Sequence, residues 1–191
     1  TSIFMFGKNL SFEAPWIGHG ASISLKLYHF NGFIFLAVSA FAVLIVIYSI
    51  PFMKDKNNTK LFYGNLLLTV SFIAGALFAN NLIMMLFFWE GLLIPLFGMI
   101  MSGGKNAYPT AIKALILSGT ADLFMTIGIC MTVYLSNGQS TIDKIHLPLD
   151  FWGSFAFIFL MIGATAKAGS MPFHSWIPDA AVDAPLPFMA F

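Results

Sequence analysis

Four charged residues lie within long apolar stretches of this sequence, where a charge is costly. They are Glu90, Lys113, Asp122 and Lys167. An uncompensated charge at the centre of a bilayer costs at least about 3 kcal/mol, so such residues usually face a partner charge, a backbone carbonyl or water. Burial and a neighbouring opposite charge act on the pKa of a lysine or a carboxyl group in opposite senses, so these groups can be poised to exchange protons.

Lys167 is the strongest candidate of the four. An apolar run, 151–166, leads to it, and the run then breaks at Gly169 and Pro172. A break in a membrane helix frees backbone carbonyls, which can hold a lysine ammonium group or a bound cation. The structural alternative is a lysine that only caps the carboxyl end of a helix. We expect Lys167 to take up and release protons.

Glu90 lies nine residues after Asn81, which is about 13 Å into a helix at about 1.5 Å per residue. A short side chain cannot reach water from that depth. It is either a protonated carboxyl group bonded to a neighbouring helix or a proton-exchanging carboxylate paired with a lysine, and we favour the second. Pro95 removes the backbone hydrogen bond to the carbonyl of Gly91 and can loosen the helix there.

Lys113 and Asp122 belong to one apolar segment but are nine residues apart. Nine residues turn an α-helix by about 900°, so the two side chains lie on opposite faces and each needs a partner elsewhere. Lys113 is close enough to the helix end that its long stem could instead snorkel to water. For Asp122 the structural alternative is a packing contact between helices.

No metal or redox centre is predicted in this chain. His174, Asp179 and Asp183 follow the break, but their spacing matches no zinc pattern, and we expect His174 and Asp179 to line a hydrated path. The single cysteine, Cys130, excludes a disulfide framework and a cysteine-ligated iron–sulfur cluster. The other histidines form no mid-membrane pair that could hold haem.

The surroundings of these residues are those of a membrane protein. Hydrophobic residues make up 59% of the sequence and charged residues 9%, whereas soluble domains contain about 25% charged residues. The net charge of +1, without a basic stripe, favours no nucleic-acid partner.

The apolar segments predict an all-α, polytopic helical bundle. Residues 1–29 are expected outside the membrane, and the alternation in 21–28 predicts a short strand there. The membrane domain, 30–191, contains about five predicted spans, and the last is discontinuous near 169–172: 30–51, 61–79, 82–102, 108–135 and 151–191. The sequence begins without Met and ends within an element, so we expect a piece of a longer protein, incomplete at both ends.

Three segments resemble the antiporter-like proton-translocating subunits of respiratory complex I, membrane-bound hydrogenases and Mrp-type cation/proton antiporters. FFWEGLLIPLF (87–97) is similar to the fifth helix of that family, with Glu90 as its functional glutamate. AIKALILSGTADLFM (111–125) is similar to the sixth, where Asp122 falls at a position that is acidic in chain-L-type members. GATAKAGSMPFHSWIPDAAVDAPLPFMAF (163–191) is similar to the broken seventh helix, with Lys167 as its central lysine.

The resemblance implies half of an inverted-repeat fold. The last segment is more similar to the chain-L-like subunit of hydrogenase-type complexes than to mitochondrial versions. SLKLYHFNGF (24–33) departs from the LDGLS-like pattern usual there. The resemblance to the family also implies that Glu90 biases the charge state of Lys167 and that Asp122 tunes this pair.

The predicted function is that of an ion-translocating subunit, for protons or alternatively sodium, in the membrane arm of a redox-driven complex. That complex would be of the NADH:quinone oxidoreductase or membrane-bound hydrogenase type, in a prokaryotic cytoplasmic membrane, with iron–sulfur clusters in partner subunits. One alternative is a subunit of a redox-independent Na⁺/H⁺ antiporter of the Mrp type. Another is a membrane anchor whose charged residues are only structural.

Overall fold

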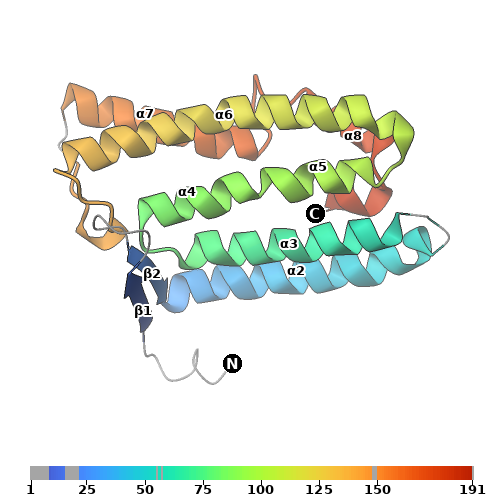
Figure 1. Ribbon diagram of the computed structural model, residues 1–191, viewed down its shortest axis with the longest axis horizontal. Coiled ribbons are helices and arrows are strands. Elements are labelled where there is room, and N and C mark those ends of the chain that lie inside the picture. Colours follow the sequence, from blue (N-terminus) through green and yellow to red (C-terminus); the bar gives the residue numbers. More distant parts are fainter. Residues whose placement is uncertain (1–8, 16–21, 55, 57, 148–149, 191) are drawn as a thin grey trace.

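The computed structural model describes residues 9–15, 22–54, 56, 58–147 and 150–190. The helices lie side by side, roughly parallel or antiparallel, and a small β-hairpin packs at one end of the bundle (Figure 1). In chain order the elements are β1 (Leu10–Pro15), β2 (Ser22–Leu27), α2 (His29–Met53), α3 (Thr59–Phe78), α4 (Leu82–Gly91), α5 (Leu93–Met101), the 3₁₀ turn η1 (Lys105–Ala107), α6 (Tyr108–Leu135), η2 (Ile142–Lys144), α7 (Phe151–Lys167), α8 (Trp176–Asp183) and η3 (Leu186–Ala190).

Membrane-length helices dominate the fold. In the part of the chain that the structure describes, four stretches are long and apolar enough to cross a bilayer: α2, α3, the combined stretch Leu82–Met101, and α6. α7 has 17 residues and is followed, after the non-helical residues 168–175, by the short α8. The prediction of a helical membrane bundle with a discontinuous last element is therefore confirmed.

The third predicted span, 82–102, is also interrupted, between α4 and α5. The N–H of Leu92 bonds to the carbonyl of Trp89 at 3.3 Å, which is a tighter turn than an α-helix makes. Pro95 has no N–H to give to the carbonyl of Gly91, so the ladder is weakened at this place. We predicted a loosening here but not two helices. The two pieces still run in line (Figure 1).

α6 and α7 pack against each other as antiparallel neighbours, and two glycines allow their backbones to approach closely. A Cβ at Gly163 would lie 2.8 Å from the backbone nitrogen of Met125, and a Cβ at Gly128 would lie 2.8 Å from that of Leu160. Only a residue without a side chain fits at such a contact. This close packing brings the last turn of α7 against the middle of α6.

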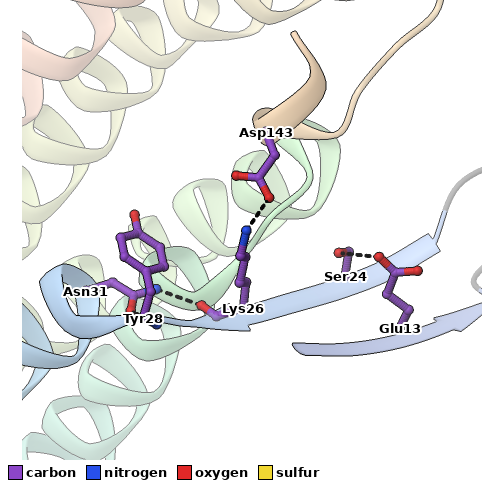
Figure 2. Close-up of polar contacts among 6 residues, drawn as sticks. All are labelled: Glu13, Ser24, Lys26, Tyr28, Asn31 and Asp143. Carbon is purple, nitrogen blue, oxygen red and sulfur yellow. Dashed lines mark hydrogen bonds and ion pairs between the residues drawn. The ribbon is translucent and has the colours of Figure 1, made fainter. Parts of the chain in front are cut away.

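Three segments meet at one end of the bundle. Lys26 of β2 forms an ion pair with Asp143 of η2 at 2.6 Å, as Figure 2 shows. The backbone N–H of Asn80 donates to the carbonyl of Ser24 at 2.8 Å, and the N–H of Ile142 donates to the carbonyl of Asn80 at 3.0 Å. The hairpin, the α3–α4 turn and the described part of the α6–α7 loop near η2 are therefore fixed to one another, and with them the start of α4.

The strand predicted in 21–28 corresponds to β2, and its antiparallel partner β1 was not predicted. Of the predicted extramembrane segment, residues 1–8 and 16–21 lie outside the described part of the chain.

Candidate functional site

Lys167 is the last residue of α7, and the sequence after it ends the helix. Gly169 has a φ of 79°, in the left-handed region that glycine adopts without a Cβ penalty. Its N–H donates to the carbonyl of Ala166 at 3.0 Å, and the N–H of Ser170 donates to that of Thr165 at 3.2 Å. These two bonds form the Schellman motif that commonly closes a helix. Pro172 lies within the non-helical residues that follow.

The ammonium group of Lys167 contacts two neighbouring helices. It lies 2.8 Å from Oδ2 of Asp122 on α6 and 2.9 Å from the carbonyl oxygen of Trp89 on α4. It also lies 4.9 Å from the centroid of the Trp89 ring, within the range of a cation–π interaction. The side chain of Lys167 is 18% exposed and that of Asp122 is 1% exposed. This is a buried ion pair.

Both carboxylate oxygens of Asp122 have partners. Oδ2 binds Lys167, and Oδ1 accepts the indole N–H of Trp89 at 2.8 Å. Trp89 therefore donates to the anion while its carbonyl and ring hold the cation. A buried carboxylate without such donors would carry a large desolvation cost.

The carbonyl of Trp89 lies at the interruption between α4 and α5. In a regular helix it would accept from the residue four positions later. Here, among the described residues, its backbone donor is the N–H of Leu92 at 3.3 Å, and its second lone pair accepts from Lys167. Trp89 was not among the residues singled out from the sequence. The signal that could have found it is a tryptophan beside Glu90 in an apolar segment, because a buried indole N–H needs a partner.

Glu90 is half-buried and belongs to the same cluster without contacting Lys167 directly. It lies close enough to Asp122 and Lys167 to interact electrostatically with both, and the hydroxyl of Thr126 is nearby. Thr126 lies one turn beyond Asp122 on α6, and its hydroxyl also lies 3.1 Å from the carbonyl of Asp122.

The expected influence of Glu90 on the charge state of Lys167 stays a prediction, and the ion pair itself joins α7 to α6. Among the described residues, the ion pair of Lys167 is made with Asp122, which we expected only to tune the pair. The reason is geometric: Asp122 faces α7 across the close α6–α7 contact, whereas Glu90 approaches from α4.

Lys113 pairs with α8. Its ammonium group lies 2.7 Å from Oδ2 of Asp179 and 2.9 Å from the carbonyl oxygen of Ser175. The prediction that Lys113 and Asp122 find separate partners on other helices is confirmed, since one contacts α8 and the other contacts α7. Lys113 is thus ion-paired and not simply extended toward water.

The remaining candidates lie in and after the break. The carboxylate of Asp183 accepts a hydrogen bond from the hydroxyl of Thr110. His174 is half-buried, and its Nδ1 has no hydrogen-bond partner among the described residues. The side chains of Asp179 and Asp183 are therefore both engaged by α6. The expectation that His174 and Asp179 line a hydrated path stays a prediction.

Comparison with known proteins gives related sequences of two kinds. The chain is 28% identical over 194 residues to Na(+)/H(+) antiporter subunit A1 of Staphylococcus aureus (strain JH9), covering 98% of this chain and 24% of that protein. It is also 28% identical over 202 residues to F(420)H(2) dehydrogenase subunit M of Methanosarcina mazei, covering 97% of this chain and 39% of that protein. The chain thus spans about a quarter to two fifths of the length of these relatives.

A solved structure shows the same fold. The Mrp complex from Dietzia sp. DQ12-45-1b matches with a TM-score of 0.86 at 18% identity, over 98% of this chain and 21% of the matched chain. The sequence pattern of the family described as NADH:quinone oxidoreductase/Mrp antiporter, TM, matches residues 79–191. That range is more than half of the chain and includes Glu90, Lys113, Asp122 and Lys167. The chain is an integral membrane protein that belongs to the NADH:quinone oxidoreductase/Mrp antiporter transmembrane family.

Proposed function

We propose that this chain is part of an ion-translocating membrane subunit, and that Lys167, Asp122 and Glu90 form its proton-handling cluster. The observation that carries the proposal is the buried Lys167–Asp122 ion pair at 2.8 Å, at the point where α7 is broken. A buried charge pair beside a helix break is expensive to build and marks ion pathways in membrane proteins.

The charges of the cluster favour exchange. If all three side chains are ionised, two carboxylates face one ammonium group and the cluster carries one net negative charge. A net charge is unfavourable in surroundings of low dielectric constant. One additional proton, or one small cation such as Na⁺, makes the cluster neutral. The cluster therefore has a place for one exchangeable positive charge.

The geometry couples that exchange to Lys167. A proton that leaves Lys167 leaves Asp122 as a buried anion without its counter-charge, and such a state is strongly disfavoured. Another positive charge must then reach the cluster. Glu90 is the nearby group whose protonation, or neutralisation by a cation, sets the net charge of the cluster. In this scheme a change of charge at Glu90 drives proton release from Lys167 or proton uptake by it.

We place the subunit in the membrane arm of a redox-driven complex in a prokaryotic cytoplasmic membrane, with other membrane subunits as partners and iron–sulfur clusters in more distant ones. A relative named as a dehydrogenase subunit supports this assignment. The alternative, a subunit of a redox-independent Na⁺/H⁺ antiporter, is supported by the relative that carries that name. Isolation of the intact complex from its own membranes separates the two, because only the first contains iron–sulfur subunits.

The proposal is tested by Lys167→Met in the full-length protein within its native complex. We expect the variant to lose ion translocation into inverted membrane vesicles, which is measured by the quenching of a pH-sensitive dye. The complex should still assemble, as seen on native gels. Lys167→Arg keeps the charge but does not release its proton near neutral pH, so it is also expected to be inactive. Lys60→Met, at an exposed lysine on α3, is the control.

Wild-type translocation by assembled Lys167→Met protein would contradict the proposal. It would instead support the view that the charges in the membrane are structural and that the chain is an anchor.

A further inference from the structure

We propose that Lys113 is a positioning residue that fixes α8 on α6, so that rearrangements caused by a change of charge at Lys167 are confined to residues 168–175. This inference rests on the proposed function of Lys167. It assigns to Lys113 and Asp179 a role in holding the broken helix, distinct from proton exchange at the Lys167 cluster.

The broken helix is tied to α6 on both sides of the break, by ion pairs of opposite polarity. Before the break, α7 supplies the cation, Lys167, and α6 supplies the anion, Asp122. After the break, α8 supplies the anion, Asp179, and α6 supplies the cation, Lys113. The two residues of α6 are about 13 Å apart along its axis at about 1.5 Å per residue, so the pairs bracket the break.

Lys113 holds the amino end of α8 by two contacts. One is the ion pair with Asp179 at 2.7 Å, in the first turn of α8. The other is the hydrogen bond to the carbonyl oxygen of Ser175 at 2.9 Å, immediately before Trp176 begins the helix. A single side chain thus binds both the boundary residue and the first turn.

The carboxyl end of α8 is held by the same part of α6. The hydroxyl of Thr110, one turn before Lys113, donates to the carboxylate of Asp183. The backbone carbonyl of Asp183 also packs directly on Gly103, where a Cβ would overlap it. Both ends of α8 are therefore fixed to the α5–α6 turn and the start of α6.

The linker between the two ion pairs takes part in none of the described ion pairs itself. Residues 168–175 are non-helical, and the Nδ1 of His174 within them has no hydrogen-bond partner among the described residues. When the Lys167–Asp122 pair opens, α7 can shift against a stationary α8 only by rearranging this linker. Without Lys113, the same shift would extend into α8.

Hydrogen exchange on the assembled complex tests whether α8 stays in place when the linker rearranges. We expect Lys167→Met to increase exchange in 168–175 while 176–183 remain as protected as in the wild type. In Lys113→Met the increase is expected to include 176–183, and the translocation rate per assembled complex is expected to fall about tenfold, in the range of ordinary coupling between sites. Asp179→Asn removes the other partner and should give the same result. Lys60→Met should change neither quantity.

A charge exchange provides the rescue. Lys113→Asp combined with Asp179→Lys restores an ion pair in the reverse orientation, and we expect it to recover both α8 protection and most of the rate. Wild-type protection of 176–183 in both single variants would overturn the inference. So would a lower amount of complex with an unchanged rate per complex, because that is the result of a purely structural pair.

The two proposals fail separately. If Lys167→Met is inactive while the Lys113 and Asp179 variants behave as wild type, only the positioning role is wrong. If Lys167→Met translocates normally, the proposed function itself fails.

Discussion

The carboxylate of Asp122 lies 2.8 Å from the ammonium group of Lys167, and with a side chain only 1% exposed it is the most deeply buried charge in the described ion pairs. This relationship places the counter-charge of the central lysine on α6, while Glu90 on α4 is a second acid beside the pair. The two acids are therefore expected to respond differently to substitution.

Asp122→Asn removes the counter-charge but preserves the shape of the side chain. Breaking a buried ion pair by removing one partner costs about 3–5 kcal/mol, because the other charge is left uncompensated. We expect a large loss of thermal stability of the detergent-solubilised complex and loss of translocation. The double variant Asp122→Asn/Lys167→Met should regain stability but not translocation, and Asp143→Asn, in the loop between α6 and α7, is the control for translocation. Unchanged stability of the single variant would show that the pair is not formed.

Trp89→Phe removes the indole N–H while the ring position and the backbone carbonyl remain. Oδ1 of Asp122 then loses its 2.8 Å donor, and a hydrogen bond to a charged group is worth about 1.5–3 kcal/mol. We expect reduced stability and slower translocation without complete loss, because Lys167 keeps Asp122 and the Trp89 carbonyl. Trp152→Phe, at an exposed tryptophan at the start of α7, is the matched control. Equal effects of the two substitutions would argue against a specific role for Trp89.

Glu90→Gln is expected to separate function from stability. It removes one of two neighbouring carboxylates, so repulsion of Asp122 is relieved, and the Lys167–Asp122 pair is left in place. We therefore expect translocation to be lost. In a thermal-unfolding comparison, the stability of Glu90→Gln should equal or exceed that of the wild type, whereas that of Asp122→Asn should be lower. A loss of stability as large as that of Asp122→Asn would mean that Glu90 is the main partner of Lys167.

The ion pair at the hairpin end predicts a weak dependence of stability on pH. The hydrogen bond and charge of Lys26 lower the pKa of Asp143 below its usual range. A depressed folded-state pKa contributes stability that is fully present above the unfolded-state value of about 3.9 and is lost as the pH falls through the folded-state pKa. The contribution is expected to be below about 1 kcal/mol, because the pair is largely exposed and screened.

Hydrogen exchange of residues 22–27 and 140–145 measures this effect locally. Protection should decrease when the pH is lowered through that range, after correction for intrinsic exchange, and Lys26→Met should remove this pH dependence. A pH dependence that persists in Lys26→Met would assign it to another group.

The elements of this protein follow largely from local properties of its sequence. Consecutive apolar residues sum their transfer free energies, so the membrane helices could be located segment by segment. The end of α7 is local too, because Gly169 and the residues beside it close the helix through their own backbone bonds. The opposite faces of Lys113 and Asp122 follow from the helical period alone.

Tertiary packing decided which charges meet. Glu90 and Asp122 are both acids in apolar helices, and nothing within either helix says which one faces Lys167. That choice depends on how α4, α6 and α7 are rotated and how closely they approach, which Gly128 and Gly163 permit at the α6–α7 contact. The bond from Lys167 to the carbonyl of Trp89 and the Lys113–Asp179 pair likewise join residues from different elements. The apolar stretches of the sequence therefore identified the charged residues of the membrane segments, and only the packing of the helices determined their partners.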